Sequence, residues 1–216
     1  MYVLTWNLFH GRAAPAAGRP LLREFATTLA ALEWDVALLQ EVPPWWPATL
    51  AFAAGADHAS ALTSRNSLLP LRRAIGKRNP DLIASAGGGA NAILVRGREI
   101  AEHRVLELTR EPERRVAHAV RLPEGWVVNL HASKDPKDRT RADVAKALAW
   151  APEPLLAFGG DLNLSRPDVP GLVHAGGHHV DHLYGEGGDP EVLDAGTLSD
   201  HRPLRVSLAA GRSRAA

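Results

Sequence analysis

The sequence contains no cysteine, few aromatic residues and no surplus of either charge. The absence of cysteine excludes disulfide bonds, thiolate metal sites and a cysteine nucleophile. The net charge of +1 gives no overall basic field that would attract nucleic acid, although basic residues can still cluster locally. No stretch approaches the 18 consecutive apolar residues of a membrane-spanning helix, so we expect neither a transmembrane segment nor a stable association with membranes.

The remaining composition is ordinary for a folded protein. Apolar residues make up 45% of the 216 residues, which is enough for one large domain with a sizeable core. Since no low-complexity linker divides the chain, we expect a single domain over residues 1–210 and a disordered tail at 211–216. No charged segment precedes an apolar one at the N-terminus, so we expect a cytoplasmic protein, and we expect it to be a monomer.

Hydrophobic periodicity predicts a mixture of strands and helices. Residues 2–6 and 36–39 are typical of strands, and residues 20–34 between them have the apolar spacing of a helix. This order predicts two neighbouring parallel strands that place Asn7 and Glu41 at the same end. Residues 100–132 predict an antiparallel meander of three strands. Further strands are expected near 56–63, 91–96, 155–158, 180–184 and 204–208, and further helices at 45–54 and 138–150.

Two glycine-containing stretches interrupt the predicted pattern in the second half of the chain. Gly159 and Gly160 follow an apolar run, and we expect them to end that strand and to place Asp161 and Asn163 in a turn. Residues 171–177 lack apolar alternation and are expected to form a loop. An acid and an amide at the end of a strand favour a ligand site, because open α/β folds bind ligands there.

Polar side chains recur wherever an apolar strand ends. Taken singly, each has an ordinary structural explanation, since an asparagine after a strand is usually a turn former and a histidine in an apolar strand can be a hydrogen-bonded core residue. Taken together, eight acid, amide and imidazole groups are suited to a metal–carboxylate site with histidines for proton transfer. The eight are Asn7, Glu41, His131, Asp161, Asn163, Asp181, Asp200 and His201.

The motifs that contain these residues are TWN at 5–7, LLQE at 38–41, NLHAS at 129–133, GGDLNL at 159–164, VDHL at 180–183 and LSDHRPL at 198–204. In order and spacing this series resembles the endonuclease/exonuclease/phosphatase superfamily, which includes pancreatic-type deoxyribonucleases, apurinic endonucleases, sphingomyelinases and inositol polyphosphate 5-phosphatases. The resemblance implies a four-layer α/β sandwich of two packed mixed β-sheets flanked by helices, with the active site at one edge.

The resemblance also implies a metal-binding half of the site. Glu41 resembles the main Mg²⁺ ligand of the family, with Asn7 beside it, and Asp200 resembles a further metal or water ligand. One carboxylate and one amide suit a hard cation that keeps several of its waters, and Mn²⁺ could take the place of Mg²⁺. Where several nucleases of the family carry an acid, two residues after Asn7, this chain has Phe9, so metal binding would depend more on Glu41.

A second half of the site would handle water and phosphate. Asp161 resembles the residue that orients or deprotonates the attacking water, and Asn163 resembles the amide that holds a phosphate oxygen. His201, positioned by Asp181, resembles the imidazole close to the scissile phosphate, and His131 resembles a second histidine that donates to that phosphate. In the deoxyribonuclease-like branch a glutamate pairs with this second histidine.

That glutamate has no counterpart here, because the corresponding strand carries Asn91 and the partner of His131 stays unassigned. The short stretch between Asn163 and Asp181 argues against a dedicated DNA-repair enzyme, because repair members grip a duplex with a longer segment there.

Several side chains near the motifs could contact the substrate. Arg12 and His10 follow Asn7 and could reach a phosphate, and Lys134 follows His131, although all three could equally be surface residues. Trp45, next to Trp46, could stack on a base or sugar or could cap the core. His178 and His179 precede Asp181, but no third ligand at a suitable spacing supports a zinc site.

The acid-free segment 64–79 carries five basic residues and is a candidate contact for a phosphate backbone or a solvated basic face. We therefore expect a Mg²⁺- or Mn²⁺-dependent phosphoesterase whose substrate is nucleic acid, with DNA cleavage as the first hypothesis. Two alternatives stay open: a phosphatase or phosphodiesterase acting on a small or lipid-linked phosphate, and a non-catalytic binding protein that has kept the fold.

Overall fold

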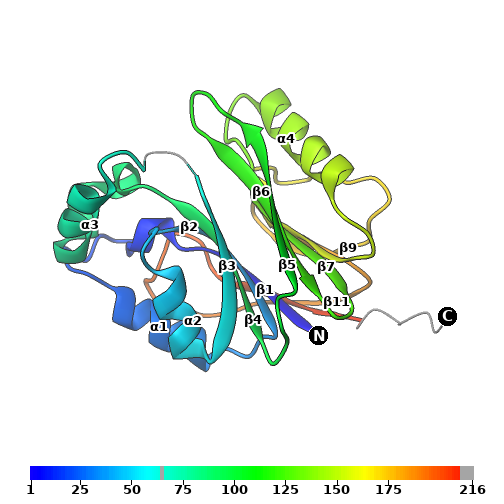
Figure 1. Ribbon diagram of the computed structural model, residues 1–216, viewed down its shortest axis with the longest axis horizontal. Helices are drawn as coiled ribbons and strands as arrows, with labels where there is room; N and C mark the ends of the chain where they lie inside the picture. Colours follow the sequence, from blue (N-terminus) through cyan, green and yellow to red (C-terminus); the bar gives the residue numbers. More distant parts are fainter. Residues whose placement is uncertain (64–65, 210–216) are drawn as a thin grey trace.

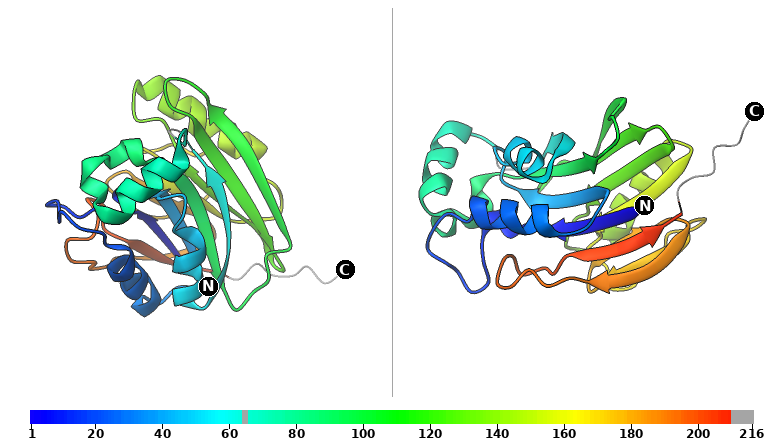
Figure 2. Two further views of the ribbon diagram at one scale, coloured as in Figure 1. Left: turned by 60° about the vertical axis from the view of Figure 1, so that its left-hand side comes forward. Right: turned by 90° about the horizontal axis from the view of Figure 1, so that it is seen from below.

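Two six-stranded mixed β-sheets pack face to face in the computed structural model, which describes residues 1–63 and 66–209 (Figure 1). The first sheet has the strand order β11-β12-β1-β2-β4-β3, and the second has the order β5-β6-β7-β8-β10-β9. Helices α1 and α2 lie on the outer side of the first sheet, and α4 lies on the outer side of the second (Figure 1, Figure 2). This arrangement confirms the predicted α/β sandwich.

The strands are β1 (Tyr2–Asn7), β2 (Val36–Val42), β3 (Ala56–Leu62), β4 (Ala90–Arg96), β5 (Glu102–Thr109), β6 (Arg115–Leu122), β7 (Gly125–His131), β8 (Leu155–Asp161), β9 (His174–His178), β10 (Asp181–Tyr184), β11 (Gly187–Val192) and β12 (Leu204–Leu208). The helices are α1 (Leu22–Ala31), α2 (Pro47–Ala54), α3 (Leu69–Arg78) and α4 (Lys137–Trp150), with 3₁₀ turns η1 (Phe9–Gly11), η2 (Pro80–Leu82) and η3 (Ala84–Gly87).

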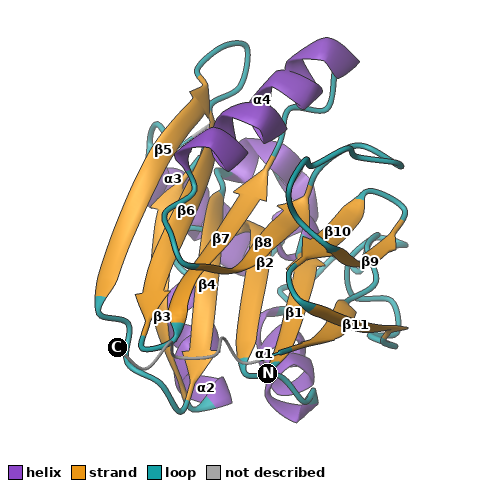
Figure 3. Ribbon diagram, turned by 90° about the vertical axis from the view of Figure 1, so that its right-hand side faces the viewer, coloured by secondary structure: helices purple, strands orange, loops and turns teal. Residues whose placement is uncertain are grey.

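Each sheet contains one parallel pair of strands joined by a helix. In the first sheet β1 pairs with β2 and the connection carries α1, and in the second sheet β7 pairs with β8 and the connection is α4 (Figure 3). The carboxyl ends of a parallel pair lie at the same edge of the sheet. The predicted pairing of residues 2–6 with 36–39 is confirmed, and Asn7 lies opposite Gln40, next to Glu41.

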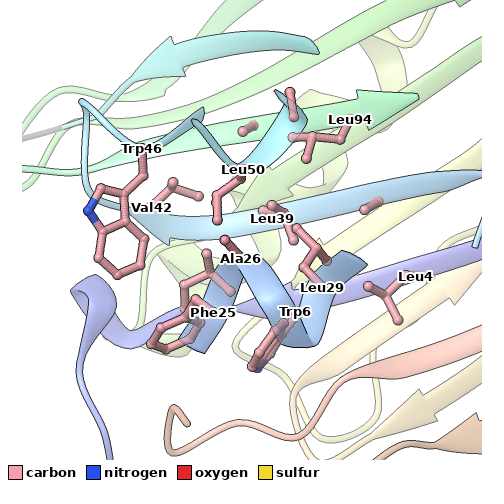
Figure 4. Close-up of a cluster of buried hydrophobic side chains, with 14 of the residues drawn as sticks. Leu4, Trp6, Phe25, Ala26, Leu29, Leu39, Val42, Trp46, Leu50 and Leu94 are labelled. Atoms are coloured by element: carbon pink, nitrogen blue, oxygen red, sulfur yellow. The ribbon is translucent and has the colours of Figure 1, made fainter. Parts of the chain in front are cut away.

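Helix α1 is held on the first sheet by an aromatic cluster. Phe25 of α1 lies 5.2 Å from the ring of Trp6 and 5.4 Å from the ring of Trp46, centroid to centroid (Figure 4). The helix ends three residues earlier than the spacing predicts, because the backbone of Leu32 is extended, and its last carbonyls bond outside the helix. The Arg96 guanidinium of β4 donates to the carbonyls of Leu29, Ala30 and Leu32.

A buried polar network crosses the interface between the sheets. Gln40 of β2 donates from Nε2 to Asn129 Oδ1 of β7 at 2.9 Å, and Asn129 Nδ2 donates to the carbonyls of Leu39 and Ala92 at 3.0 Å each. The same amide lies 3.1 Å from Nε2 of His118, whose Nδ1 is 3.2 Å from His103 Nε2. Buried polar groups are costly unless they are paired, so this network fixes how the two sheets sit relative to each other.

Two expectations about glycine-containing segments are wrong. Gly159 and Gly160 do not end a strand, because β8 continues through them to Asp161. A Cβ on Gly160 would lie 2.1 Å from the carbonyl oxygen of Leu130, so only glycine lets β8 approach β7 this closely. Residues 171–177 are not a loop throughout, since β9 begins at His174. Its Gly176 faces Pro190 of β11 at a distance where a side chain would clash.

The basic segment 64–79 contains α3, a surface helix with no buried residue, while residues 64 and 65 lie outside the described part of the chain. The expected tail at 211–216 also lies outside it. Within residues 1–63 and 66–209, every helix is too short or too polar to cross a membrane.

Candidate active site

The carboxyl ends of both parallel pairs meet at one edge of the sandwich. Asn7 of β1 donates from Nδ2 to Oδ2 of Asp161 in β8 at 3.0 Å. His131 of β7 places Nε2 at 3.4 Å from the same Asp161 oxygen and at 4.0 Å from Oε1 of Glu41 in β2. Four residues from four strands and two sheets therefore form one cluster, as the strand-end positions predicted.

Strained backbone marks the same edge. Glu41, Asn163 and Ser199 adopt positive φ angles of 50°, 52° and 68°, a region that non-glycine residues rarely occupy. Such conformations persist only where the surroundings hold them, and they gather at functional sites. Ser199 is held by its hydroxyl, which donates to the carbonyl of Asn7 at 2.7 Å and accepts from the amide of His201 at 3.1 Å.

Asp161 lies buried at the centre of the cluster. Besides the bond from Asn7, its Oδ1 accepts the backbone amide of Asn163 at 3.0 Å. Burial and the nearby charge of Asp181 raise the pKa of Asp161 to about 7, against the lowering effect of His201 and Asn7. A carboxyl group with a pKa near neutrality can accept a proton and return it, which suits a general base.

Asp181 and His201 form a second pair beside Asp161. Asp181 of β10 lies directly opposite Asp161 in the antiparallel register, and its Oδ2 is 2.7 Å from Nδ1 of His201. Burial would lower the pKa of His201, but the hydrogen bond and charge of Asp181 outweigh burial and raise it to about 9. His201 is therefore an imidazolium at neutral pH, able to donate to a phosphate oxygen.

The partner of His131 is Arg115, which sequence reasoning missed. Arg115 of β6 donates from Nη1 to Nδ1 of His131 at 2.9 Å, and its Nη2 pairs with Glu113 at 2.6 Å. A guanidinium can only donate, so Nδ1 accepts and the proton of the neutral ring sits on Nε2, facing Asp161 and Glu41. Burial and the charge of Arg115 lower the pKa of His131 well below its ordinary value. His131 is thus a neutral donor.

Glu41 also has a partner whose role was not predicted. Nε2 of His10 lies 3.0 Å from Oε2 of Glu41, and its Nδ1 lies 3.2 Å from the carbonyl oxygen of Gly88. Burial would raise the pKa of Glu41, but the hydrogen bond and charge of His10, with the charge of Arg115, hold it well below the usual range. Glu41 is therefore ionised throughout the neutral range. His10 itself was considered only as a possible phosphate contact.

The donor set fits a divalent cation. Ligand atoms of Asp161, Asp181 and His201 lie within 4.8 Å of one another, and because the His201 imidazolium has no free ring lone pair, the two carboxylates are the ligands that this group offers. Among the described residues, Oδ1 of Asp181 is buried without a hydrogen-bond partner. This group differs from the predicted ligands Asn7, Glu41 and Asp200. Of those, Glu41 is partly exposed and permanently charged, whereas the Asp200 side chain is 45% exposed and reaches only to 4.0 Å from His201 Nε2. Oxygen-rich sites of this kind suit Mg²⁺ or Mn²⁺.

The remaining predicted residues lie around the rim. Asn163 donates from Nδ2 to the Ala132 carbonyl at 3.0 Å, which leaves its second amide proton for a ligand. Lys134 lines a groove of about 220 Å³ that it shares with Arg115. Arg12 is engaged elsewhere, because its Nε pairs with Asp81 at 2.9 Å.

The ring of Trp45 packs under α3, where a Cβ on Gly76 would lie 2.9 Å from it. Trp46, by contrast, is buried in the core beside Phe25. Substrate contacts by Arg12, Trp45 and Lys134 stay predictions.

Comparison with known proteins identifies the family of this chain. Residues 4–203 match the Endonuclease/Exonuclease/phosphatase family, and the chain belongs to it. No curated protein matches the sequence. The family membership supports a metal-dependent phosphoesterase.

Solved structures agree on the fold. An endonuclease/exonuclease/phosphatase from Beutenbergia cavernae DSM 12333 is 20% identical with a TM-score of 0.73, over 95% of this chain and 70% of that one. D. rerio TDP2 humanized by 14 mutations is 14% identical with a TM-score of 0.69, and the match covers 95% of this chain and 97% of that one. A mannosyl-6-phosphatase from Bacteroides thetaiotaomicron VPI-5482 is 15% identical with a TM-score of 0.65, and the match covers 97% of this chain and 99% of that one.

Proposed function

We propose that this protein is a Mg²⁺- or Mn²⁺-dependent nuclease that hydrolyses phosphodiester bonds in DNA. The observation that carries the choice of substrate is the position of α3. This helix has no acidic residue and carries Arg72, Arg73, Lys77 and Arg78, and no residue of it is buried. Clustered lysine and arginine side chains bind a phosphate backbone, and a protein of net charge +1 needs such a local patch to bind DNA.

Helix α3 and the segment after it adjoin the catalytic edge. The ring of Trp45, four residues after Glu41, packs against Gly76 in the middle of the helix. Past the helix, Asp81 pairs with Arg12, and the Gly88 carbonyl contacts His10, which in turn contacts Glu41. A strand of nucleic acid that lies along α3 would therefore pass the Glu41–Asp161 cluster.

The chemistry follows from the side chains. Glu41 and Asn7 would hold the divalent cation, and Asp161 and Asp181 would contribute carboxylates from the second sheet. When bound, the cation would supply Lewis-acid stabilisation of the charge on the phosphate oxygens. Asp161 orients the attacking water and takes its proton. In-line attack forms the new P–O bond as the bond to the leaving oxygen breaks.

Donors surround the position of the phosphate. The His201 imidazolium, held by Asp181, and the Nε2 proton of His131, held by Arg115, stabilise the charge that grows on the phosphate oxygens. Asn163 supplies its free amide proton to the same group. These donors are fixed before the substrate arrives, so little reorganisation is needed in the transition state.

The test is a substrate panel in the presence of Mg²⁺ or Mn²⁺: plasmid, single-stranded, abasic and RNA oligonucleotides, together with inositol, sugar and lipid phosphates. We expect turnover of DNA, and we expect Asp161→Asn to reduce it by about 10²-fold or more, as for the loss of a general base. Turnover that is absent on every substrate, or unchanged in Asp161→Asn, would contradict an enzymatic role for this site.

Charge reversal on α3 tests the choice of DNA over a small ester. We expect Arg73→Glu/Lys77→Glu to weaken DNA cleavage at least tenfold and to leave hydrolysis of a small phosphate ester unchanged, since each lost phosphate contact weakens binding and lowers its salt dependence. Arg23→Glu, an exposed arginine of α1, is the matched control. If small sugar or lipid phosphates are the better substrates and α3 has no effect, the protein is a phosphatase of the same family.

A further inference from the structure

A pocket of about 280 Å³ is lined by Asp181 and His201 and by several residues that the chemistry described above does not use. His178 and His179 line it, together with Asp200 and Arg202, which flank His201 in the sequence. The pocket thus lies next to the place where His201 would meet the scissile phosphate. Its size suits a phosphate group with part of its ester, which is smaller than a drug-sized ligand.

The two histidines occupy the tip of the β9–β10 hairpin in a strained turn. β9 ends at His178 and β10 begins at Asp181, so the turn consists of His179 and Val180. His179 has a φ of +54°, a conformation that turns usually assign to glycine or asparagine. The two imidazole rings contact each other with their centroids 4.2 Å apart, and both residues line the pocket.

The nitrogen-bearing side chains of the pocket are available to a ligand. In the part of the chain that the structure describes, neither the Arg202 guanidinium nor the His178 and His179 rings make a side-chain hydrogen bond or ion pair. The acids are less available, because Asp181 is already bonded to His201, and Asp200 reaches only to 4.0 Å from His201 Nε2. Arg202 and two imidazoles that can donate N–H hydrogen bonds therefore outnumber Asp200, the one lining acid whose carboxylate is not already bonded to His201 at short distance, and this balance favours an anion.

We propose that this pocket binds a second phosphate of the substrate, the one that neighbours the scissile phosphate along the strand. The proposal rests on the proposed nuclease function and sharpens it, because a substrate with consecutive phosphates would occupy both sites at once. A phosphomonoester of a small sugar would leave the pocket empty. Arg202 and His179 are then specificity-determining residues, and His178 supports the His179 ring.

Thymidine trinucleotides with one neutral linkage provide the test. A methylphosphonate in place of one phosphate removes the charge and keeps the shape, so the cleavage rate at the other linkage reports the effect of its neighbour. We expect kcat/KM at the scissile linkage to be about tenfold higher when the neighbouring linkage is charged, mainly through KM, as for one partly exposed charge-assisted contact. The methylphosphonate is placed in turn on the 5′ side and on the 3′ side of the scissile linkage, so that the comparison covers both directions along the strand.

Variants of the pocket residues test whether this ratio of kcat/KM values depends on the pocket. In Arg202→Ala and in His179→Ala we expect the charged-to-neutral ratio to fall toward one, whatever happens to the absolute rate. Arg23→Ala on α1 should keep the wild-type ratio. A ratio of one in the wild-type protein, or a ratio that both pocket variants leave unchanged, would overturn the proposal.

A binding measurement separates this proposal from the proposed function. The measurement is made in EDTA, where cleavage is suppressed. The Cε1–H resonances of His178 and His179 are followed by NMR while each trinucleotide is added. The variants His178→Gln and His179→Gln identify which resonance belongs to which residue. We expect larger shifts with the all-phosphate trinucleotide than with its neutral analogue. Equal shifts, or none, would overturn the second phosphate site. Selective shifts in a protein that cleaves no DNA would instead contradict the nuclease function alone.

Discussion

Arg115 gives His131 a different character from the one implied by the deoxyribonuclease-like branch. A glutamate partner would accept a proton from the ring and favour its charged form, whereas Arg115 donates to Nδ1 at 2.9 Å and favours the neutral form. His131 can therefore offer one fixed hydrogen bond to a phosphate oxygen but is poorly suited to deliver a proton. In the proposed mechanism, proton transfer then depends on Asp161 and His201.

Removing Arg115 should impair catalysis more than binding. We expect Arg115→Gln to lower kcat by about 10- to 100-fold with little change in KM, because partners that orient a site residue commonly have effects of this size. Arg115→Lys should recover part of the loss, since it restores a cationic donor. Arg121→Gln, an exposed arginine on the same strand, is the control. A loss of the same size in the control, or no loss in Arg115→Gln, would contradict this role of Arg115.

His118 links the stability of the protein to pH. Burial, with a smaller contribution from His103, lowers the pKa of His118 to about 3 from its ordinary 6.5. Between these values the unfolded chain binds a proton that the folded protein excludes. The free energy of unfolding should therefore rise with pH there, and His118 contributes about 1.4 kcal/mol per pH unit at most. Acidification below pH 6.5 should progressively destabilise the fold.

His118→Gln should remove that one-proton component. Urea unfolding at several pH values between 4.5 and 6.5 gives the slope of the free energy of unfolding against pH, and we expect the variant to have the shallower slope. A wild-type His118 ring whose NMR signal titrates near pH 6 in the folded protein would contradict the prediction, as would an unchanged slope.

Site residues were predictable from sequence where they stand at the end of an apolar strand. They were not predictable where their role depends on a contact formed by tertiary packing. Asp161, Asp181 and His201 follow or begin apolar strands in recognisable motifs, and the structure brings their ligand atoms together. The His10–Glu41 and Arg115–His131 contacts join residues that are distant in sequence and depend on how loops and sheets meet. A lone arginine at the start of β6 carries no local pattern that identifies its partner.

The glycines of β8 show how an element can depend on what surrounds it. Gly160 has a φ of +130°, and a Cβ there would lie 2.1 Å from the Leu130 carbonyl and 3.0 Å from both Gln40 Nε2 and Asn129 Oδ1. The strand thus passes directly under the polar network that joins the sheets. Gly160 allows the close approach to β7 that brings Asp161 level with His131, and Gly159 allows a similar approach to His182 of β10.

Gly160→Ala should be severely destabilising. Backbone strain of about 1–3 kcal/mol and overpacking of a similar size act together at this position, so we expect the free energy of unfolding to fall by roughly 3 kcal/mol or more. Gly171→Ala is a matched control, because Gly171 also has a positive φ of +81° but no atom within 4 Å of the added Cβ. Urea denaturation of both variants makes the comparison, and equal losses would contradict the steric explanation.

Elements with regular apolar patterns were predicted, and those without them were not. The parallel pair β1–β2 and the meander of β5, β6 and β7 follow directly from periodicity. β9 and β11 carry the sequences HAGGH and GGDPEV, which have almost no apolar alternation. They are strands because neighbours supply their hydrogen bonds, so local propensity could not reveal them.

Considered as a whole, the molecule builds its site from two similar halves. Each half contributes a parallel pair with a crossover helix, and the two pairs are packed so that their carboxyl ends face the same side. Carboxylates from both halves then lie close together, and their mutual repulsion is part of what raises the pKa of Asp161. The fold therefore stores electrostatic strain at this edge, which a bound cation would relieve.

That strain predicts that divalent metal stabilises the entire fold. A cation that binds only the folded state raises the free energy of unfolding by about 2.7 kcal/mol at 100 times its dissociation constant. For a chain of 216 residues this corresponds to a rise in Tm of roughly 5–10 °C. We expect Mg²⁺ or Mn²⁺ to produce such a rise in thermal unfolding and EDTA to reverse it.

Glu41→Gln should abolish most of this rise, because the substitution removes the permanently ionised carboxylate of the site while keeping its shape. Glu99→Gln, an exposed acid in the turn between β4 and β5, should keep the full rise. If metal still raises the Tm of Glu41→Gln fully but no longer raises the Tm of Asp181→Asn, the metal binds at the Asp161–Asp181–His201 group and not at Glu41. No rise with either metal in the wild-type protein would contradict a divalent site at this edge.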